Sequence, residues 1–472
     1  MLLRNFFIFI YLSITVFLFA TLEASISLWM SFMGNALILT FITYYHIFIE
    51  RRYSPFLSTY IVFNFLFFLV APLAQISEFN MMETPVFTHY FPFSELTFIK
   101  TNGLIAIFNV VFFLFYVGCK DYIKIKKKKP VKKTYSLSSI FIFIILSVLV
   151  LIINYDFFLD ELSRPSWLTS TYNVSHLLIV KKVLFLMPLA GAILCIDYYK
   201  NYKINTQKWI LATAMLFFLI ALLLLFKNPL TEKRNALGPI YLLLLFLFVP
   251  KLLNSNVKST LLLFVVMIIG FPLSQFLTHI DYGFDEILTN PSLLFAKNQL
   301  SEGYMSLNYD AFINIGVVME HVEFEGLSYG YQLLSGLLFF VPRSIWAAKP
   351  DASGLIVGNH VIDHYDFHFA NLSNPYIAEG YMNFGIIGVV FMAIVLALSI
   401  VYFLTWLNSS NPFKKSIAFY FAMHLIFLLR GDFTSGYSYF IGTLVGLYVI
   451  PKMIIYISTF ILDRKIWVSR KN

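Results

Sequence analysis

Charged residues and cysteines are scarce in this chain of 472 residues. Only 12% of its residues are Asp, Glu, Lys or Arg, whereas ordinary soluble domains contain about 25%. Apolar residues make up 59% of the chain and the mean hydropathy is +0.77, so a water-soluble fold is excluded. The two cysteines, Cys119 and Cys195, are too few for a disulfide framework, and redox chemistry is not expected.

Several motifs of nucleotide and metal enzymes are also missing. The sequence has no internal repeat, no glycine-rich phosphate loop, no low-complexity tail and no Cys-x-x-Cys metal pattern. The net charge of +9 would suggest an anionic partner in a soluble protein, but a membrane protein retains basic residues for another reason. A nucleic-acid partner is therefore not expected.

Long apolar runs fill most of the chain. A helix needs about 20 predominantly apolar residues to cross a hydrocarbon core of roughly 30 Å. The first run is not followed by a small-residue cleavage site, so it is expected to remain as a membrane anchor. The runs predict twelve transmembrane helices, at residues 5–22, 27–49, 56–74, 101–118, 136–154, 183–199, 209–226, 237–250, 259–277, 381–404, 417–429 and 437–457.

These runs predict an all-α, multi-pass membrane protein in three parts. Residues 1–277 would hold about nine spans, 278–380 one large loop, and 381–472 three further spans. If the N-terminus is inside, 23 of the 34 basic residues fall on inner segments and 21 of the 25 acidic residues on outer ones. Cytoplasmic loops retain Lys and Arg, so both termini are expected in the cytoplasm. No inner loop is long enough for a nucleotide-binding domain, which argues against ATP-driven transport by this chain alone.

The large outer loop contains twelve acidic residues but only three basic ones, Lys297, Arg343 and Lys349. The last two flank Trp346 in a proline-bounded string that follows an apolar run at 331–341. That run is too short to span and is expected to be interfacial or re-entrant. One guanidinium and one ammonium held there suit a lipid phosphate or pyrophosphate. The alternative is interfacial anchoring by snorkelling cations, with Trp346 at the headgroup level.

A second string, residues 373–388, leads into the next predicted span. It places Glu379 at the outer membrane boundary beside Tyr381 and Asn383. The Glu379 carboxylate could accept a proton or hold a sugar hydroxyl, or it could pair with a nearby arginine. Tyr376, like Trp346 in the first string, offers an aromatic face for a sugar ring.

Further arginines belong to the same predicted face. Arg430 and Asp432 lie in a short outer loop between the last two spans, and Arg234 stands at a span entrance. Together with Arg343, these arginines could line a single anionic site at one membrane depth. Asp432 is a further candidate proton acceptor.

Three histidines, His360, His364 and His368, recur every four residues, which would stack them on one helix face. Such a stack resembles a metal or proton site, but the surrounding composition is that of a loop and no His-Glu-x-x-His pattern is present. No metal site is therefore predicted, and His364 remains a candidate base. His46 and His424, in or near spans, are expected to be hydrogen-bonded packing residues.

Three strings together resemble the signatures of O-antigen (Wzy-type) oligosaccharide repeat-unit polymerases. The resemblance is concentrated in residues 340–435, and the span number and the large outer loop extend it loosely over the chain. The strings are Pro342-Arg343-x-x-Trp346-x-x-Lys349-Pro350, Glu379-Gly380-Tyr381-x-Asn383-Phe384-Gly385 and Arg430-Gly431-Asp432.

The resemblance implies a bacterial inner-membrane enzyme with the architecture of lipid-dependent (GT-C-like) glycosyltransferases, active on the periplasmic face. Such an enzyme moves a growing glycan from undecaprenyl pyrophosphate to the nonreducing end of a fresh carrier-linked repeat unit. No metal or other cofactor is implied, and outer-loop arginines would bind the pyrophosphates. That role would fall on Arg343 and then on Arg234 and Arg430. A chain-length regulator is a candidate partner besides the two carrier-linked substrates and the bilayer.

Two other functions remain open at this stage. An O-antigen ligase of related architecture would transfer finished glycan to a lipid A core, and its outer-loop pattern is expected to contain histidine. A flippase or other transporter of lipid-linked glycans would place charges in the middle of its spans. This sequence places its charges at the outer rim instead, which favours an enzyme.

Overall fold

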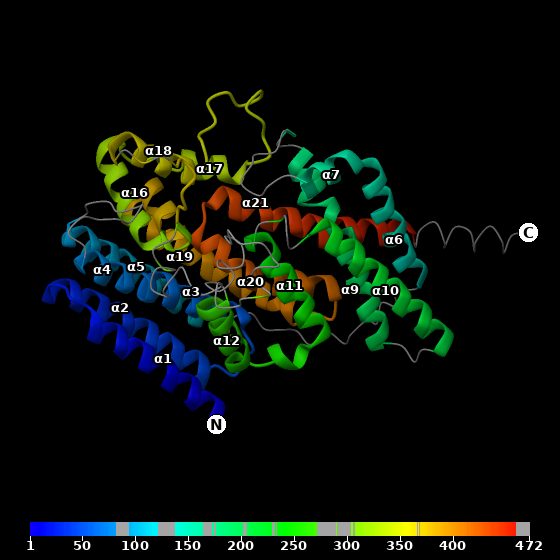
Figure 1. The fold of residues 1–472 in the computed structure, drawn as a ribbon, viewed down its shortest axis with the longest axis horizontal. Coiled ribbons are helices and arrows are strands. Elements are labelled where there is room, and N and C mark those ends of the chain that lie inside the picture. The colour runs from blue at the N-terminus through cyan, green and yellow to red at the C-terminus, as the bar shows by residue number, and fades with distance from the viewer. Residues whose placement is uncertain are drawn as a thin grey trace, which may run out of the picture. The chain divides into compact units, whose positions relative to one another are not determined.

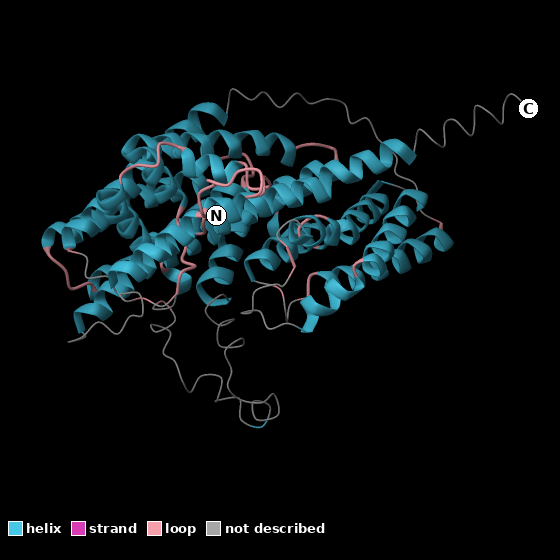
Figure 2. Ribbon diagram, turned by 90° about the horizontal axis from the view of Figure 1, so that it is seen from above, coloured by secondary structure: helices cyan, strands magenta, loops and turns pink. Residues whose placement is uncertain are grey.

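A computed structural model describes most of the chain as helices joined by loops, and it contains no strand within the described residues (Figure 2). The described residues are 1–81, 94–120, 137–163, 172–173, 176–201, 205–228, 232, 234–270, 289, 304, 307–365, 367 and 369–458.

The chain divides into two compact units, and Figure 1 labels the helices in chain order. Unit 1 comprises Met1–Tyr122, Lys251–Val401 and Leu425–Gly436. Its helices are α1 (Leu2–Thr21), α2 (Ile26–Tyr44), η1 (Tyr45–Ile49), α3 (Pro55–Phe65), η2 (Leu66–Val70), α4 (Ala71–Met81), α5 (Glu95–Lys120), α12 (Asn256–Val265), η6 (Val266–Gly270), η8 (Leu307–Tyr309), α16 (Ala311–Glu325), α17 (Tyr331–Leu337) and α18 (Ser353–Tyr365).

Unit 2 comprises Ile123–Pro250, Tyr402–His424 and Tyr437–Asn472. Its helices are α6 (Leu137–Ile153), α7 (Tyr155–Ser163), η3 (Leu177–Lys181), η4 (Leu184–Leu186), α9 (Met187–Asn201), α10 (Thr206–Phe226), α11 (Arg234–Phe248) and η9 (Val445–Val449). Four helices contribute residues to both units: η5 (Pro250–Leu253), α19 (Tyr376–Leu407), α20 (Pro412–Arg430) and α21 (Phe433–Leu444).

Nine helical segments within the described residues are long and apolar enough to cross a bilayer, which makes the chain a multi-pass membrane protein. The bent pair of α6 and α7, with 78° between its parts, would add a tenth span. The predicted spans 237–250 and 259–277 correspond to shorter apolar helices, Asn235–Phe248 and Asn256–Ile268. The described part of every predicted span thus falls on a helix, while residues 136 and 271–277 of the predicted spans lie outside the described residues. Within the described residues, two of the twelve fall on helices shorter than a full span and one is bent.

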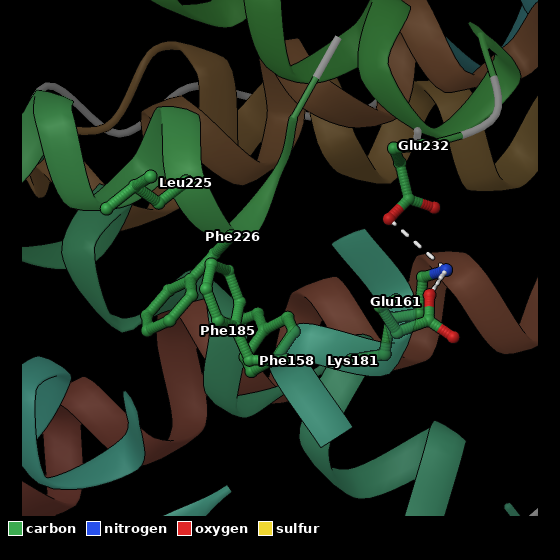
Figure 3. A pocket seen from close by; sticks show the side chains of 7 residues that line it. All are labelled: Phe158, Glu161, Lys181, Phe185, Leu225, Phe226 and Glu232. Atoms are coloured by element: carbon green, nitrogen blue, oxygen red, sulfur yellow. Dashed lines mark hydrogen bonds and ion pairs between the residues drawn. The ribbon is translucent and has the colours of Figure 1, made fainter. Parts of the chain in front are cut away.

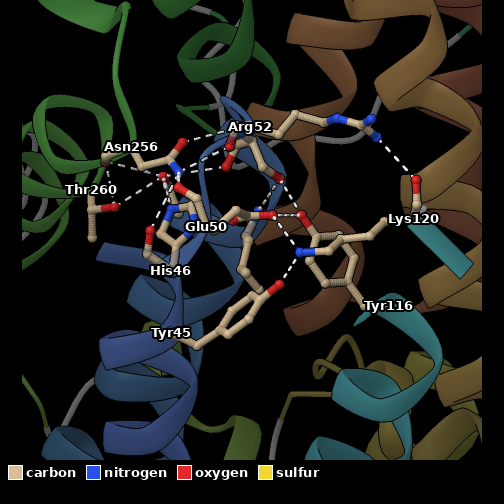
Figure 4. A network of polar contacts seen from close by, with 11 residues as sticks. Tyr45, His46, Glu50, Arg52, Tyr116, Lys120, Asn256 and Thr260 are labelled. Atoms are coloured by element: carbon tan, nitrogen blue, oxygen red, sulfur yellow. Dashed lines mark hydrogen bonds and ion pairs between the residues drawn. The ribbon is translucent and has the colours of Figure 1, made fainter. Parts of the chain in front are cut away.

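A buried polar network joins helix ends of unit 1 (Figure 4). His46 Nδ1 lies 2.6 Å from Glu50 Oε2, and its Nε2 lies 2.8 Å from Ser58 Oγ. Tyr116 OH donates to Glu50 Oε1 at 2.6 Å, and Lys120 Nζ lies 3.9 Å from the same oxygen. Because buried polar groups are costly unless they are paired, this network fixes where α2, α3 and α5 meet. His46 is bonded, as the sequence predicts for a packing residue.

Asn256 attaches α12 to the same network. Its amide nitrogen faces three backbone carbonyls of the turn before α3, those of His46 and Glu50 at 3.3 Å and that of Arg52 at 3.0 Å. Its carbonyl oxygen accepts from Ser54 N at 2.9 Å. One side chain thereby satisfies backbone groups that the turn leaves without helical partners.

Other contacts in unit 1 bring together helix ends that the charge pattern assigns to the opposite, outer face. Ser25 N donates to Glu95 Oε1 at 3.3 Å, and Gln75 Nε2 donates to Tyr309 O at 3.1 Å. The buried network joins only ends that the charges assign to the inner face. In these contacts of unit 1, helix ends that the charge pattern assigns to the same face lie together. Which face is cytoplasmic remains a prediction.

Helix α19 is broken near its beginning. Phe384 has φ −143° and ψ 19°, and Gly385 has φ +60° and ψ −143°, a left-handed conformation that favours glycine. Past the break the chain returns so closely that a Cβ on Gly388 would lie 1.8 Å from the carbonyl oxygen of Gly380. Residues 376–383 therefore form a short helical piece of their own ahead of the long membrane helix.

We expect the substitution Glu50→Gln to destabilise unit 1 by roughly 1–3 kcal/mol, because it leaves buried donors without a charged acceptor. The measurement is the thermal unfolding midpoint of the purified protein in detergent. Arg51→Gln is the matched control, since Arg51 is exposed in the same turn. Equal midpoints for the two variants would show that the network does not hold these helix ends.

Candidate active site

The cationic string of residues 342–350 forms a loop that is fastened to α17. Lys349 Nζ donates to three carbonyl oxygens at the end of that helix, those of Leu338 and Phe339 at 3.0 Å and that of Val341 at 2.9 Å. Leu338 is the C-cap of α17, and Phe339 and Val341 follow it, so the ammonium holds the turn after the helix and serves as a cap. Burial, and then the nearby Arg343, lower the pKa of Lys349. In this structure Lys349 shapes the loop rather than pointing away from it.

Trp346 fixes the same loop from its other side. Its indole nitrogen donates to Tyr331 OH at 3.0 Å, and Tyr331 OH donates to Ala348 O at 2.8 Å. The two rings meet edge to face, with 5.5 Å between centroids. Ser335 Oγ adds a bond to Pro350 O at 3.0 Å. The loop is thus held at several points although it projects beyond its helices (Figure 1).

Arg343 is the cation that this loop presents to its surroundings. Its guanidinium donates to Lys349 O at 2.6 Å and forms an ion pair with Asp351. The Arg343 side chain is 55% exposed and that of Asp351 49%. Exposed pairs of this kind contribute little, roughly 0–1 kcal/mol, so an incoming anion can replace the carboxylate at small cost.

Asn383 connects this loop to the second string. Its amide nitrogen donates to Gln332 Oε1 at 3.1 Å and to Glu379 O at 2.8 Å. Its carbonyl oxygen accepts from Leu333 N at 3.1 Å and from Ser328 Oγ at 3.2 Å. Asn383 is fully buried and uses both ends of its amide, so α17 and the short helical piece of α19 are held together by one side chain.

Glu379 connects the second string to the third. The side chain is 0% exposed, and its Oε1 accepts from Phe433 N at 2.8 Å and from the Ser353 hydroxyl. Phe433 N belongs to the first turn of α21 and Ser353 begins α18. Free N–H groups at a helix N-terminus favour a carboxylate. Glu379 pairs with no arginine among the described residues, so the ion pair considered from the sequence is not formed here.

The second oxygen of Glu379 is left open. Oε2 is buried and has no hydrogen-bond partner in the structure. The adjacent Asn374 is also fully buried, and neither end of its amide makes a hydrogen bond of ordinary geometry. Asp432 caps α21 by accepting from Ser435 N at 2.9 Å, and it interacts electrostatically with Glu379. Two carboxyl groups therefore gather at one helix N-terminus, one buried and one partly exposed.

Arg430 is held by an internal partner. Its Nη2 donates to Leu307 O at 2.5 Å and lies 3.1 Å from Asp310 Oδ1. Asp310 is itself buried and accepts from Ser373 Oγ at 2.7 Å and from Asn314 Nδ2 at 3.0 Å. This network ties the end of α20 to the start of α16 and to the segment before Glu379. Arg430 consequently positions the candidate site in this structure.

The other residues singled out from the sequence lie in different surroundings. Tyr376 is only 3% exposed, and its ring centroid lies 6.1 Å from that of Phe433, so its ring offers no free face to a sugar. Tyr381 is half-buried. Arg234 begins α11 in unit 2, and its side chain lies outside the described part of the structure. The single site of three arginines therefore remains a prediction.

A histidine from another helix joins the predicted histidine stack. His360 and His364 lie on α18 with ring centroids 4.3 Å apart, and His321 of α16 lies 5.3 Å from His360. Burial, and then the neighbouring His364 and His321, lower the pKa of His360 to about 4, while Asp363 acts in the opposite direction. Burial also lowers the pKa of His321. No group of described residues is arranged to hold a metal, and His368 lies outside them.

Sequence reasoning missed several members of these clusters. Ser353 and Asn374 are uncharged residues without a motif, and Asp310 was one of many acidic residues in the loop. His321 lies far from the other histidines in the sequence. His321 joins the other histidines because α16 packs against α18. This packing is a property of the fold and cannot be read from the sequence.

Comparison with known families supports the resemblance found in the strings. A sequence model of the O-antigen polysaccharide polymerase Wzy family matches residues 372–462. The matched region includes the second and third strings but not the loop that carries Arg343. It supports a role in O-antigen polymerisation. Neither the curated proteins nor the solved structures compared with the chain gave a match.

We expect Lys349→Gln to loosen residues 338–352, because three carbonyls at the end of α17 lose their charged donor. Amide hydrogen exchange of the purified protein measures this directly, and exchange of this segment should become about tenfold faster or more. Ser344→Ala is the control, since Ser344 is exposed in the same loop. Unchanged exchange in the Lys349 variant would contradict the capping role.

We expect the packing of α16 on α18 to weaken as the pH falls from 6.5 towards 4. The folded protein keeps His360 neutral in this range, whereas the unfolded chain binds a proton, so stability is lost on acidification. The slope is at most about 1.4 kcal/mol per pH unit for one group. His360→Gln should flatten the pH dependence of the unfolding midpoint relative to wild type. Parallel curves for the two proteins would contradict this assignment.

Proposed function

We propose that this protein polymerises undecaprenyl-pyrophosphate-linked oligosaccharide repeat units into an O-antigen or capsule-type polysaccharide. The reaction transfers a growing glycan from its carrier to the nonreducing end of a fresh carrier-linked unit. A C–O bond forms to the acceptor hydroxyl, the C–O bond to the pyrophosphate breaks, and the hydroxyl proton passes to a base. The protein is then a glycosyltransferase of the bacterial inner membrane that works on the periplasmic face.

The observation that carries this proposal is the convergence of three separate strings on one cluster in unit 1. Asn383 bonds to α17, whose loop presents Arg343, and Glu379 bonds to both Ser353 and the first turn of α21. These contacts join residues that lie 26 to 54 positions apart in the sequence. A merely structural helix bundle does not require an exposed arginine on a braced loop that is connected to this cluster through α17.

Arg343 is the proposed ligand of the pyrophosphate. Its guanidinium is exposed, can bind two phosphate oxygens at once, and stands on a loop braced by Lys349 and Trp346. Negative charge develops on the pyrophosphate oxygen as the glycosidic carbon leaves it. A cation held in advance stabilises this charge without a reorganisation cost.

Asp432 is the proposed acceptor of the hydroxyl proton. It is partly exposed, whereas Glu379 is completely buried and bonded to two donors through one oxygen. In this scheme Glu379 positions α18 and α21 through its bonds to Ser353 and Phe433. His364, exposed on α18, is the alternative base.

The surroundings of the arginine loop suit a carrier lipid. Leu334, Leu337, Phe340 and Ile345 are exposed apolar side chains on α17 and on the loop that follows it. Aromatic and apolar residues next to a single cation are typical of segments at the membrane interface. The polyprenyl tails would remain in the bilayer while the pyrophosphate reaches Arg343.

A ligase that transfers finished glycan to a lipid A core is the alternative. The cluster of His321, His360 and His364 on the outer segment is the observation that favours it, since a histidine pattern is expected of ligases. The products separate the two functions. Loss of a polymerase leaves a single repeat on the final acceptor, and loss of a ligase leaves long polymer on the carrier.

We expect Arg343→Ala to abolish long-chain polymer while the protein remains in the membrane. Loss of one preorganised charge stabiliser typically costs about 10²–10³ in rate. Arg343→Lys should retain part of the activity, because the charge remains but the bidentate geometry is lost. The measurement is electrophoresis of surface glycan from a deletion strain that expresses each variant at a verified level.

Ser344→Ala is the control for Arg343→Ala, because it alters the neighbouring exposed position without removing a charge. Polymer of normal length in the Arg343→Ala strain would overturn the proposed pyrophosphate role. Long polymer that stays on the carrier in the deletion strain would favour the ligase.

A further inference from the structure

Two lysines from different helices of unit 2 meet at one pair of aromatic rings. Lys414, in the first turn of α20, has its Nζ 5.0 Å from the ring centroid of Trp406 and 5.9 Å from that of Tyr448. Lys452, in the last span, has its Nζ 5.8 Å from the same Tyr448 centroid. The centroids of Trp406 and Tyr448 lie 4.9 Å apart. We call these four residues the lysine–aromatic cluster, and the charge pattern assigns it to the inner face.

The lysine–aromatic cluster is open to its surroundings. Lys452 is exposed, and Lys414, Trp406 and Tyr448 are each partly exposed. Neither ammonium group forms an ion pair with a carboxylate of the described residues. The aromatic faces attract a cation but carry no net charge with which to neutralise it. Both positive charges are therefore available to an anion from outside the chain.

Further lysines add to the positive charge at these helix ends. Lys415 Nζ lies 5.5 Å from the ring centroid of Phe246, and its charge is repelled by that of Lys200 at the end of α9. The first turn of α20 contains no acidic residue, although the positive end of the helix dipole lies there. On the predicted inner segments of unit 2, the described residues include one acid, Asp197, and five lysines: Lys200, Lys208, Lys414, Lys415 and Lys452.

Lysines at the predicted outer face of unit 2 are bound differently (Figure 3). Lys181 forms an ion pair with Glu161, and its Nζ lies 3.4 Å from Glu232 Oε2. Lys227 Nζ lies 3.7 Å from the same Glu232 oxygen. These two lysines are neutralised by carboxylates of the chain itself. The lysine–aromatic cluster lacks such carboxylates among the described residues, so an anionic ligand is favoured there.

We propose that the lysine–aromatic cluster binds the phosphate of an anionic phospholipid such as phosphatidylglycerol. The phosphate accepts hydrogen bonds from Lys414 and Lys452, while Trp406 and Tyr448 lie at the level of the lipid headgroup. The lipid thereby joins the end of α19, the start of α20 and the last span. The inference does not depend on the proposed function, because no step of the proposed reaction uses these residues.

The arrangement of the cluster goes beyond a topology signal. Retention of lysines in cytoplasmic loops depends only on their charge, whereas here two ammonium groups from different helices converge on one ring. Basic sites between membrane helices on the cytoplasmic side are typical places for anionic headgroups. A zwitterionic headgroup is disfavoured, because it would add a cationic group beside a cluster of lysines.

The test is native mass spectrometry of the full-length protein in detergent, titrated with dioleoyl phosphatidylglycerol and, separately, with dioleoyl phosphatidylcholine. We expect wild type to bind phosphatidylglycerol about tenfold more tightly than phosphatidylcholine. The double substitution Lys414→Gln and Lys452→Gln should weaken binding of phosphatidylglycerol about tenfold or more. Lys208→Gln with Lys251→Gln is the matched control, because it removes two exposed lysines that contact no aromatic ring within the described structure.

A charge-conserving variant separates loss of charge from loss of folding. Lys414→Arg with Lys452→Arg keeps both cations and should bind phosphatidylglycerol within about threefold of wild type. Three results would each overturn the lipid site: no preference of wild type for phosphatidylglycerol, equal binding by the glutamine variant and the control, or a loss in the arginine variant as large as in the glutamine variant. The polymer phenotype of the Arg343 variants does not enter this test.

Discussion

The arrangement of α17, α18 and the first turn of α21 depends on two buried side chains of one short helical piece, Glu379 and Asn383. Asn383 uses its whole amide on α17 and on its own helix, and Glu379 holds the first turns of α18 and α21. Hydrogen bonds are directional, and a buried polar group that loses its partner costs about 1–3 kcal/mol. These bonds therefore fix positions that apolar packing, which has no preferred direction, would leave open. The break at Phe384 and Gly385 makes this possible, because it frees the short piece from the axis of the long helix.

The proposed chemistry follows from how differently the cations near this piece are bound. Lys349 donates hydrogen bonds to three carbonyl oxygens, and Arg430 forms an ion pair with Asp310, so both side chains position other groups. Arg343 alone among these three is largely exposed, with a carboxylate partner that is equally exposed. An exposed pair on a braced loop can exchange its carboxylate for a phosphate without unfolding anything. The same reasoning explains why the net charge of +9 does not identify the ligand. Most basic residues fall on the predicted inner face, whereas the proposed ligand of the pyrophosphate is one arginine of the predicted outer face.

Much of the fold could be predicted from the sequence, because a membrane helix requires a long apolar run and the described part of every such run lies on a helix. The exact ends of the helices could not be predicted. The break in α19 could not be predicted either, because it accompanies the close approach of Gly380 and Gly388 in the folded chain. For the site, the structure connects the three strings through Asn383 and Glu379, and the family comparison confirms the resemblance over residues 372–462. The roles of the residues in these strings stay a prediction. Their partners were not identified, because Ser353, Asn374 and His321 carry no pattern of their own and acquire importance only when their helices pack. Tyr376 shows the opposite error: an aromatic residue in a motif faces the core.

In the proposed function this chain alone joins carrier-linked repeat units. Its most direct test is to reconstitute the purified protein in liposomes with one synthetic undecaprenyl-pyrophosphate-linked repeat unit and to analyse the glycolipids and the released carrier. We expect a ladder of carrier-linked products that differ by one repeat, with one undecaprenyl pyrophosphate released for each new linkage. Substrate that remains a single repeat, with no carrier released by a folded and correctly inserted protein, would contradict it.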